Sequence, residues 1–320
     1  PTIRILNPVV REANGATHKL TPMEARLRNL NYLAPIELDF TIIEDGIEKE
    51  PEKVHIGDLP IMLRSKRCNL YKESMEDERE LTESEYREKL IEAGEDPADP
   101  GGYFIIGGTE RVLISLEDLA PNRVMVEYNE RYGTQLEVAK VFSQKEGYRA
   151  LTLVEKKKDG ILMVTVPAAS GQIPLVILMK ALGMENDKEI YDAIVSVPDM
   201  ANIVYANIEE CHDKKLYPPN GVFTTEDALN YLERKFATGQ AREYREKKVE
   251  SIIDRSLLPH LGDTKDDRIK KAYFLGRIAR SVLELSIGMR KEDDKDHYAN
   301  KRLKLSGDLM EDLFRVAFTN

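Results

Sequence analysis

The sequence has 320 residues, of which 42% are hydrophobic and 32% are charged, and its formal net charge is −10. This composition is typical of a globular protein long enough for two domains. It excludes a membrane-spanning protein, because no apolar run approaches the roughly 20 residues that a membrane helix needs. A chain this acidic is repelled by DNA as a whole, so any contact with nucleic acid must come from local basic patches.

The two cysteines, Cys68 and Cys211, are far apart in the chain. No Cys-x-x-Cys pair is present, which excludes the spacing of a zinc ribbon. We therefore expect two buried, reduced thiols in a cytoplasmic protein. The chain begins at Pro1 rather than at a Met, which indicates a segment of a longer protein.

The first 130 residues predict a mixed structure of strands and short helices. Thr21 with Pro22 and Glu24 predicts a helix that runs through Arg28. A capping box at Thr82–Glu85 predicts a second helix that stops at Gly94. The acid-rich stretch 73–99 indicates a solvated excursion from the fold. Strands are predicted at 3–10 and 36–43, and a pair of strands is predicted around 103–128.

The run Gly101–Ser115 at first suggests a phosphate-binding loop. Gly102 and Gly107 have the spacing of a P-loop, and Thr109 stands where a magnesium-binding hydroxyl would be. Gly108, however, occupies the position of the phosphate-binding lysine, so nucleotide binding is the weaker interpretation.

The better interpretation of this run is a β-hairpin. Tyr, Phe and Ile between the glycine pairs favour a pleated strand. A tight Gly107-Gly108 turn would then join two strands, with Val112 and Ile114 on one face of the second.

The pattern changes after residue 131. Strands are predicted at 135–142, 150–154 and 161–166, with a hairpin turn at Asp159-Gly160. The chain becomes helical after Pro174, and capped helices are predicted at 186–195 and 224–236, followed by helices at 240–256 and 266–287. The last of these carries a small or apolar stripe: Ile269, Ala272, Tyr273, Gly276, Ala279, Val282, Leu283 and Ser286.

Gly101–Ser115 also carries a resemblance that several other blocks share. Together these blocks resemble the second-largest subunit of multisubunit DNA-dependent RNA polymerases, in the archaeal and eukaryotic form. They occur in the family's order over nearly the whole chain: Asn14–His18, Pro22–Leu30, Leu59–Cys68, Ile173–Val176 with Ala181–Gly183, Lys271–Gly276 and Asp293–Leu303.

The resemblance implies an α+β fold of two mixed domains, with the second inserted into the first. Residues 1–130 would form the protrusion, truncated at its start. Residues 131–289 would form the lobe, and residues 290–320 would return to the protrusion and begin the fork. The rest of the subunit would follow. The compact, Glu- and Lys-rich connections between the blocks indicate an archaeal source.

The same resemblance implies a place in a nucleotidyltransferase without catalysis by this segment. In the family the catalytic Mg²⁺ is held by an Asp-x-Asp-x-Asp motif of the largest subunit, and no such motif occurs here. We therefore expect no cofactor and no metal in this chain. The implied partners are the other polymerase subunits, the template and non-template DNA strands, and general transcription and elongation factors.

The segment Asp293–His297 is an alternative metal site, because three carboxylates and a His lie within five residues. The EF-hand template fails there, with Ala299 in place of its Gly and Leu305 in place of its Glu. Interleaved basic residues favour salt bridges on a surface instead.

Two basic clusters are the candidate contacts with nucleic acid, because Lys and Arg at close spacing can meet successive phosphates. The alternative is a solvated charge run, and the whole chain could then be a stand-alone docking module without nucleic-acid contact. Arg234-Lys235 lies among glutamates and is predicted as a solvated face. The candidates are Arg64, Lys66 and Arg67, and Lys301, Arg302 and Lys304, of which Lys301 and Arg302 are preferred.

Two positions depart from the family's pattern. Gly107 replaces a common Asn, and Ala299 replaces a common Gly. Gly107 would lose a side-chain hydrogen bond, and Ala299 would be strained if its backbone needed a positive φ.

Overall fold

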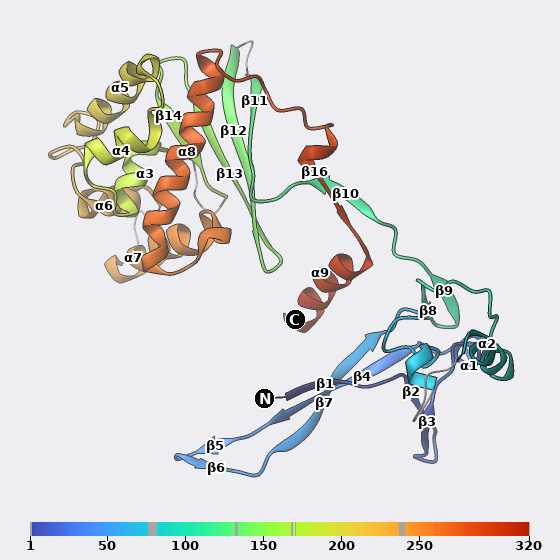
Figure 1. Cartoon of the computed structure of the whole chain (residues 1–320). Coiled ribbons are helices and arrows are strands. Elements are labelled where there is room, and N and C mark those ends of the chain that lie inside the picture. The colour runs from blue at the N-terminus through green and yellow to red at the C-terminus, as the bar shows by residue number, and fades with distance from the viewer. Residues whose placement is uncertain are drawn as a thin grey trace. The chain divides into compact units, whose positions relative to one another are not determined.

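The computed structural model describes residues 2–75, 82–131, 134–167, 169, 171–236 and 241–319. The chain divides into two compact units, residues 1–115 and 116–320, and each is described by itself (Figure 1). Both contain helices together with antiparallel strands, which confirms the α+β class. The insertion of one domain into the other, and the domain boundaries, stay predictions.

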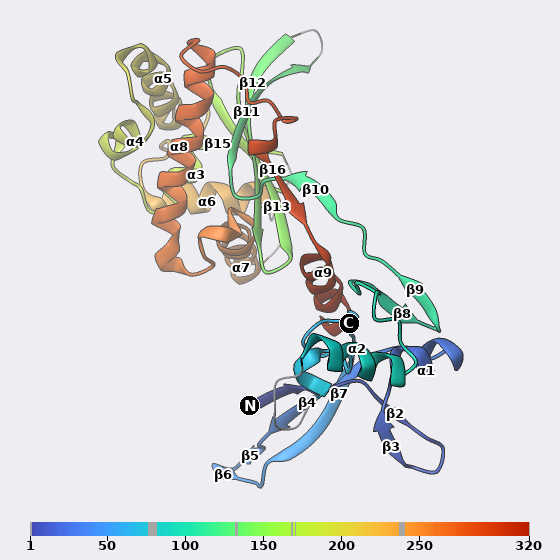
Figure 2. The same cartoon turned by 45° about the vertical axis from the view of Figure 1, so that its right-hand side comes forward.

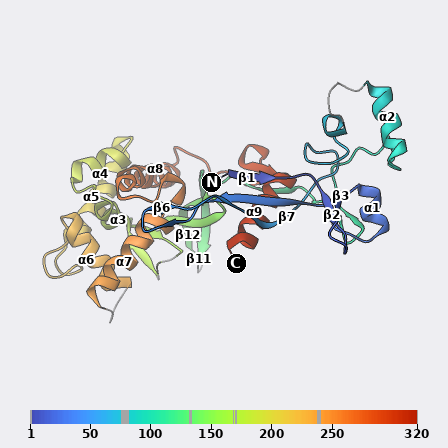
Figure 3. The ribbon, with the colours of Figure 1, turned by 90° about the horizontal axis from the view of Figure 1, so that it is seen from below.

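The first unit is built on a three-stranded antiparallel sheet in the order β1-β4-β7, and three hairpins and two helices are attached to it. Figure 3 shows α1, β2 and β3 at one end of the long strand β7. The elements are β1 (Thr2–Ile5), β2 (Val9–Arg11), β3 (Thr17–Lys19), α1 (Pro22–Leu27), β4 (Leu33–Phe40), β5 (Ile43–Glu44), β6 (Ile47–Glu48), β7 (Glu52–Pro60), α2 (Glu83–Glu92), β8 (Phe104–Ile106) and β9 (Thr109–Arg111).

Both predicted helix caps of this unit are confirmed. The Thr21 hydroxyl accepts a hydrogen bond from the Glu24 amide at 3.2 Å. Thr82 and Glu85 form the reciprocal capping box, which satisfies amide groups that the first turn of a helix leaves without partners.

The predicted solvated excursion is wrong at its C-terminal end. Leu90 is fully buried and Glu95 is 6% exposed, because α2 packs its Leu90 side into the core of the first unit. The acidic composition did not indicate that Leu90 enters the core, that Met75 and Tyr86 pack against it, or that Glu95 is a paired, buried carboxylate. Residues 76–81 of that stretch lie outside the described residues.

The hairpin predicted within Gly101–Ser115 is confirmed as β8 and β9, with Ile106 opposite Thr109. Gly107 and Gly108 have φ values of 58° and 72°, which is the requirement of a two-residue turn of this type. The prediction for Val112 and Ile114 is wrong, because β9 ends at Arg111. Both side chains lie beyond the strand and are 67% and 83% exposed.

The second unit contains a five-stranded antiparallel sheet in the order β11-β12-β13-β14-β15. Figure 2 shows the helices α3 to α8 on one side of this sheet, with α8 running along it. The elements are β10 (Leu116–Leu119), β11 (Val124–Arg131), β12 (Thr134–Lys145), β13 (Tyr148–Lys156), β14 (Leu162–Thr165), β15 (Gln172–Pro174), α3 (Leu175–Ala181), α4 (Asp187–Ile194), α5 (Ala201–His212), α6 (Thr225–Phe236), α7 (Arg242–Ser251), α8 (Arg268–Ser286), β16 (Lys301–Lys304) and α9 (Ser306–Thr319).

Short turns of helix complete the chain. The 3-10 turns are η1 (Lys72–Met75), η2 (Pro198–Met200), η4 (Pro259–Leu261), η5 (Lys265–Asp267) and η6 (Tyr298–Asn300). A π-helical turn, η3 (Ile252–Ser256), follows α7 directly. None of the helices in the described ranges combines the length and apolar character that a membrane span requires.

The hairpin at Asp159-Gly160 is confirmed, but with a longer loop than two residues, because Lys156 pairs with Leu162. The side chain of Asn207 holds this longer loop in place with two hydrogen bonds. Its side-chain NH₂ donates to the Gly160 carbonyl at 3.0 Å, and its side-chain oxygen accepts from the Leu162 amide at 2.7 Å. Asn207 belongs to α5, a helix that the sequence analysis missed although Val204, Ile208 and Cys211 follow a helical period and are buried.

The stripe predicted on α8 is only partly the buried face. Ile269 and Tyr273 are 38% and 53% exposed. Gly276 lies against α4, where an added Cβ would come 3.0 Å from the Cβ of Ala193. The sheet and α4 meet α8 on adjacent sides, so the buried face is wider and turned from the predicted stripe. Its buried members are Lys271, Ala272, Leu275, Gly276, Ile278, Ala279, Ser281, Val282, Leu283 and Leu285.

Both cysteines are buried and free. Cys68 packs in the first unit, where its sulfur lies 3.4 Å from the hydroxyl of the fully buried Tyr32. Cys211 packs in the second unit, and burial raises the pKa of its thiol to about 12. Burial shields both thiols from reactants, and the raised pKa further makes Cys211 a poor nucleophile.

Lys271 is fully buried on α8, and its side chain hydrogen-bonds to the π-helical turn η3. Its ammonium group donates to the carbonyls of Ile253 and Asp254 at 3.0 and 2.6 Å. Burial lowers the pKa of Lys271 from 10.5 to about 8, although nearby Asp254 opposes the shift.

We expect this depressed pKa to make stability rise with pH. Between about pH 8 and 10.5 the unfolded chain binds a proton at Lys271 that the folded chain has released, so the free energy of unfolding rises by about 3 kcal/mol across that window. The difference in urea-unfolding free energy between the wild type and Lys271→Met, measured from pH 7 to pH 11, isolates this residue from Cys211, which titrates in the opposite sense. A constant difference would refute the assignment.

Candidate nucleic-acid interface

The acidic segment Asp293–His297 is held together by its own protein contacts. Asp293 accepts from the Val126 amide at 2.8 Å and from Arg290 at 2.7 Å, which ties the segment to the edge strand β11. The Asp294 side chain accepts from the Asp296 amide at 2.8 Å. These contacts give the segment a structural role, as the interleaved charges predict.

A buried carboxylate on β11 anchors the same segment. Glu127 forms ion pairs with Lys140 and with Lys295. Burial acts to raise the pKa of Glu127, but the two lysine hydrogen bonds outweigh it and hold the pKa below its ordinary value. The segment thereby positions the strand that follows it.

That strand, β16, carries the preferred basic candidates. It pairs antiparallel with β10, so that Lys301 lies opposite Leu119 and Arg302 opposite Asp118. Successive side chains of a strand point to opposite faces. Lys301 and Arg302 are therefore directed away from each other.

The three basic residues of β16 differ in how far their charge is compensated. Lys301 forms an ion pair with Glu117 at 2.6 Å, and this hydrogen bond raises the pKa of Lys301 above its ordinary value. Lys304 forms an ion pair with Asp312 at 3.1 Å. Arg302 is exposed and donates to the carbonyls of Lys301 and Ala299 at 2.7 and 3.3 Å. Within the described ranges it has no carboxylate partner, so it presents the least compensated charge of the three.

The second basic cluster lies in the first unit, in the loop after β7. Arg64 is half-buried, with its guanidinium stacked 5.6 Å from the ring of Tyr86 and hydrogen-bonded to the Tyr86 hydroxyl at 2.5 Å. Its other bond goes to the Asp96 carbonyl at 3.0 Å. Lys66 and Arg67 are exposed. Arg64 thus serves packing, whereas Lys66 and Arg67 are the exposed members of this cluster.

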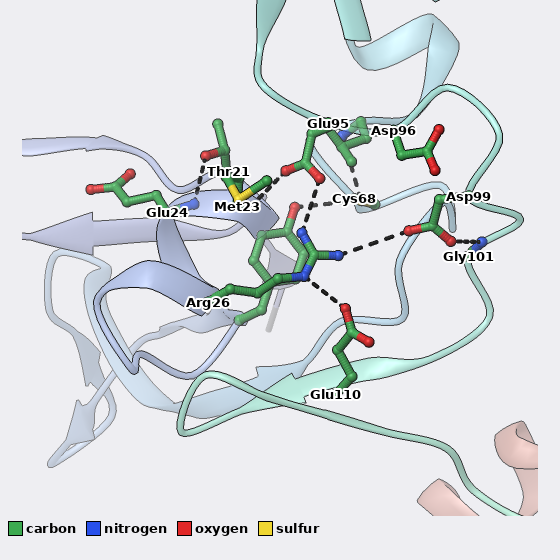
Figure 4. A network of polar contacts seen from close by, with 12 residues as sticks. Thr21, Met23, Glu24, Arg26, Cys68, Glu95, Asp96, Asp99, Gly101 and Glu110 are labelled. Atoms are coloured by element: carbon green, nitrogen blue, oxygen red, sulfur yellow. Dashed lines mark hydrogen bonds and ion pairs between the residues drawn. The ribbon is translucent and has the colours of Figure 1, made fainter. Parts of the chain in front are cut away.

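Arg26, which belongs to one of the sequence blocks but was not predicted as a site residue, holds the first unit together (Figure 4). Its guanidinium bonds to Glu95 at 3.0 Å, to Glu110 at 2.8 Å and to the Tyr103 hydroxyl at 2.6 Å. Burial acts to lower the pKa of Arg26, but the hydrogen bonds that it donates to Glu95 and Glu110 raise the pKa above its ordinary value.

The network continues through Asp99. The Tyr103 hydroxyl donates to Asp99 at 2.5 Å, and Asp99 also accepts from the Gly101 amide at 2.9 Å. Burial acts to raise the pKa of Asp99, but these two hydrogen bonds lower it overall. Three distant stretches, the helix α1, the loop after α2 and the hairpin β8–β9, therefore meet at Arg26. The signature Gly101–Ser115 is a structural motif in this unit.

One group among the described residues has the spacing of metal ligands: Glu12, His18 and Glu24. Arg28 already binds both carboxylates, at 2.7 Å to Glu12 and 2.6 Å to Glu24. A divalent cation there would compete with a guanidinium for the same oxygens, so the arrangement favours an ion-pair cluster.

The two departures from the family's pattern are accommodated. The Gly107 amide donates to the Asn31 side chain at 2.6 Å, which supplies a hydrogen bond to the turn from outside it. Ala299 lies in a 3-10 turn and is not among the residues with positive φ, so it carries no backbone strain of that kind.

The solvated face predicted at Arg234-Lys235 is wrong for Lys235. Its side chain is half-buried and hydrogen-bonds to the Gln172 carbonyl, with the ammonium 5.7 Å from the ring centre of Tyr231. Burial lowers the pKa of Lys235. Arg234 is exposed, as expected.

Comparisons with known proteins agree with the resemblance. A family model described as RNA polymerase beta subunit matches residues 1–320. DNA-directed RNA polymerase subunit Rpo2N of Methanocaldococcus jannaschii is 51% identical over 99% of this chain and 61% of its own length. The Rpo2N subunit of Halobacterium salinarum strain R1 is 46% identical over 98% of this chain and 58% of its own length.

Subunit Rpo2 of Saccharolobus shibatae is 46% identical over 99% of this chain and 26% of its own length. The chain thus spans about three fifths of the Rpo2N relatives and about a quarter of the Rpo2 relative. The family model matches the whole chain, from the first strand to α9. The chain therefore belongs to the RNA polymerase beta subunit family.

Proposed function

We propose that this chain works within a DNA-directed RNA polymerase as part of one wall of the DNA cleft and as a docking surface for transcription factors. The family and the archaeal subunits that it resembles support this role. The other polymerase subunits are its partners, and template and non-template DNA pass along it in the cytoplasm. Nucleotide addition needs the catalytic Mg²⁺ of the largest subunit, so the chain by itself is inactive.

The exposed charge of Arg302 on β16 is the observation that supports a direct contact with DNA. A guanidinium without a carboxylate partner can bind a phosphate without first breaking an ion pair. Lys301 and Lys304 add to the positive electrostatic potential, but Glu117 and Asp312 form ion pairs with them and compensate most of their charge.

Arg302→Ala in a reconstituted polymerase tests this contact. We expect promoter complexes to dissociate faster, and the slope of log affinity against log salt to fall by about 1 for the lost phosphate contact. Arg242→Ala is the matched control, because Arg242 is also exposed and forms an ion pair with Glu246 in the same helix. Equal salt slopes for Arg302→Ala and wild type would refute the contact.

A docking module without nucleic-acid contact is the second candidate, and the helix α9 favours it. None of its residues is buried, and its exposed apolar side chains include Leu313, Val316 and Phe318 at 62%, 62% and 63%. Unchanged promoter opening and elongation in the Arg302→Ala enzyme would favour this alternative.

A further inference from the structure

Four arginines of the second unit surround one hollow that none of the preceding assignments uses. Arg277 and Arg280 come from α8, Arg290 follows that helix, and Arg123 precedes β11. The hollow has a volume of about 470 Å³, and Glu284 is the only carboxylate among its lining residues. Its lining therefore carries an excess of positive charge on a chain whose net charge is −10.

Three of these guanidinium groups are held in place by the protein. Arg280 donates to the carbonyls of Ile194 and Ala193 at the end of α4, at 3.1 and 2.9 Å. Arg290 is bound to Asp293 at 2.7 Å, and Arg123 to the Ala299 carbonyl at 3.0 Å. A guanidinium has five N–H donors, so each retains donors after these contacts.

Arg277 differs from the other three. Its side chain is exposed and makes no hydrogen bond or ion pair within the part of the chain that the structure describes. It therefore offers a full guanidinium fork at the mouth of a site whose other donors are already positioned. Such pre-ordered donors lower the entropic cost of binding an anion.

The convergence of several arginines indicates a phosphate group more than a carboxylate. One guanidinium satisfies the two coplanar oxygens of a carboxylate in a bidentate pair, whereas a phosphate has oxygens directed several ways. Guanidinium groups from three separate stretches around one hollow suit the second geometry.

An exposed aromatic ring lies beside this hollow. Tyr273 is 53% exposed, one helical turn before Arg277. It lines a neighbouring hollow of about 430 Å³ that shares Arg277 and Arg280. Aromatic rings next to cations are the arrangement that binds single strands, because bases stack on the rings while phosphates meet the cations.

We propose that the Arg277 face, formed by Arg123, Tyr273, Arg277, Arg280 and Arg290, binds single-stranded nucleic acid. A phosphate occupies the arginine-lined hollow, and an adjacent base stacks on Tyr273. Glu189 and Asp192 border the neighbouring hollow and oppose the strand electrostatically, as Glu284 does in the first. Binding is accordingly weak and strongly dependent on salt.

The test is binding of a fluorescein-labelled oligothymidylate to the 320-residue chain, followed by anisotropy over a range of salt concentrations. Arg277→Ala is expected to weaken binding about fivefold and to lower the salt slope by about 1. Tyr273→Leu is expected to weaken it at least fivefold with the slope unchanged. Glu284→Gln is expected to strengthen it about threefold, which loss of structure could not do.

Arg242→Ala and Tyr244→Leu on α7 are the matched controls, because both side chains are exposed and neither lines the two hollows. Wild-type affinity in Arg277→Ala and Tyr273→Leu would overturn the proposal. If poly-glutamate displaced the labelled oligonucleotide as well as unlabelled oligothymidylate does, the face would be assigned to an acidic peptide instead. Displacement by inorganic phosphate at the phosphate concentration of the oligonucleotide would assign it to a free anion.

This inference does not depend on the DNA contact proposed at Arg302. An Arg302→Ala chain that binds the oligonucleotide normally, while the α8 variants do not, would support the Arg277 face, and the β16 contact would still be judged by the salt slope of the reconstituted polymerase. Normal binding by the α8 variants, with weaker binding by Arg302→Ala, would overturn the Arg277 face and leave the β16 contact standing.

Discussion

Replacing Arg26 by leucine is expected to lower the free energy of unfolding of the first unit by about 3–5 kcal/mol. The side chain of Glu95, its partner at 3.0 Å, is only 4% exposed. Removal of the guanidinium leaves that carboxylate buried without a counter-ion, and a bond to the Met23 amide at 2.6 Å is not enough to compensate it. Calorimetry and urea unfolding followed by circular dichroism measure the loss.

Two further variants separate the charge effect from lost packing. Adding Glu95→Gln to Arg26→Leu should recover part of the stability, because the amide oxygen can still accept from Met23 without a buried charge. Arg28→Ala is the control, since its ion pairs with Glu12 and Glu24 are more exposed and surface pairs contribute little. An Arg26→Leu chain as stable as Arg28→Ala would show that the network is not what holds this unit.

The second large effect is expected at Gly101. A Cβ there would lie 2.4 Å from the Cγ of Arg64 and 2.6 Å from the carbonyl oxygen of Leu63. The Leu63 carbonyl cannot move freely, because it accepts from the Gly102 amide at 3.1 Å while the Leu63 amide donates to the Tyr103 carbonyl at 2.9 Å. Gly101→Ala should cost about 3 kcal/mol or more, from overpacking added to a strained backbone.

Gly102 is the matched control for this prediction. Its φ of +85° is similar to the +71° of Gly101, but a Cβ at 102 would meet nothing within 4 Å. Gly102→Ala should therefore cost only the left-handed strain, about 1–2 kcal/mol. Both are measured by the midpoint of thermal unfolding of the chain, and equal losses for the two alanines would contradict the steric argument.

Local features were predictable because their causes are local. The capping residues Thr21 and Thr82 act within one helical turn, and the Gly107-Gly108 turn depends on two backbone angles. Apart from Val112 and Ile114, where the strand ends earlier than predicted, the predictions that went wrong concern partners from elsewhere in the chain. The solvated excursion failed at Leu90 and Glu95 because the first packs into the core and the second meets Arg26, 69 residues away.

The candidate interface shows the same division. Spacing identified Lys301, Arg302 and Lys304 as basic neighbours, but it could not show that Glu117 and Asp312 compensate two of them. The arginines around the hollow come from positions 123, 277, 280 and 290. No window along the sequence joins them, because they lie within one surface only after β11 and α8 have packed together.

The sequence by itself determined the family, the α+β class and the start of each capped helix, since these follow from the order of the blocks and from interactions between near neighbours. The tertiary structure decided which charges are compensated and which are exposed. It made Gly101–Ser115 part of a structural network through Arg26, and it turned Tyr273 outward beside Arg277. The physical reason is that compensation of a charge depends on contacts between residues far apart in the chain, which the linear pattern does not encode.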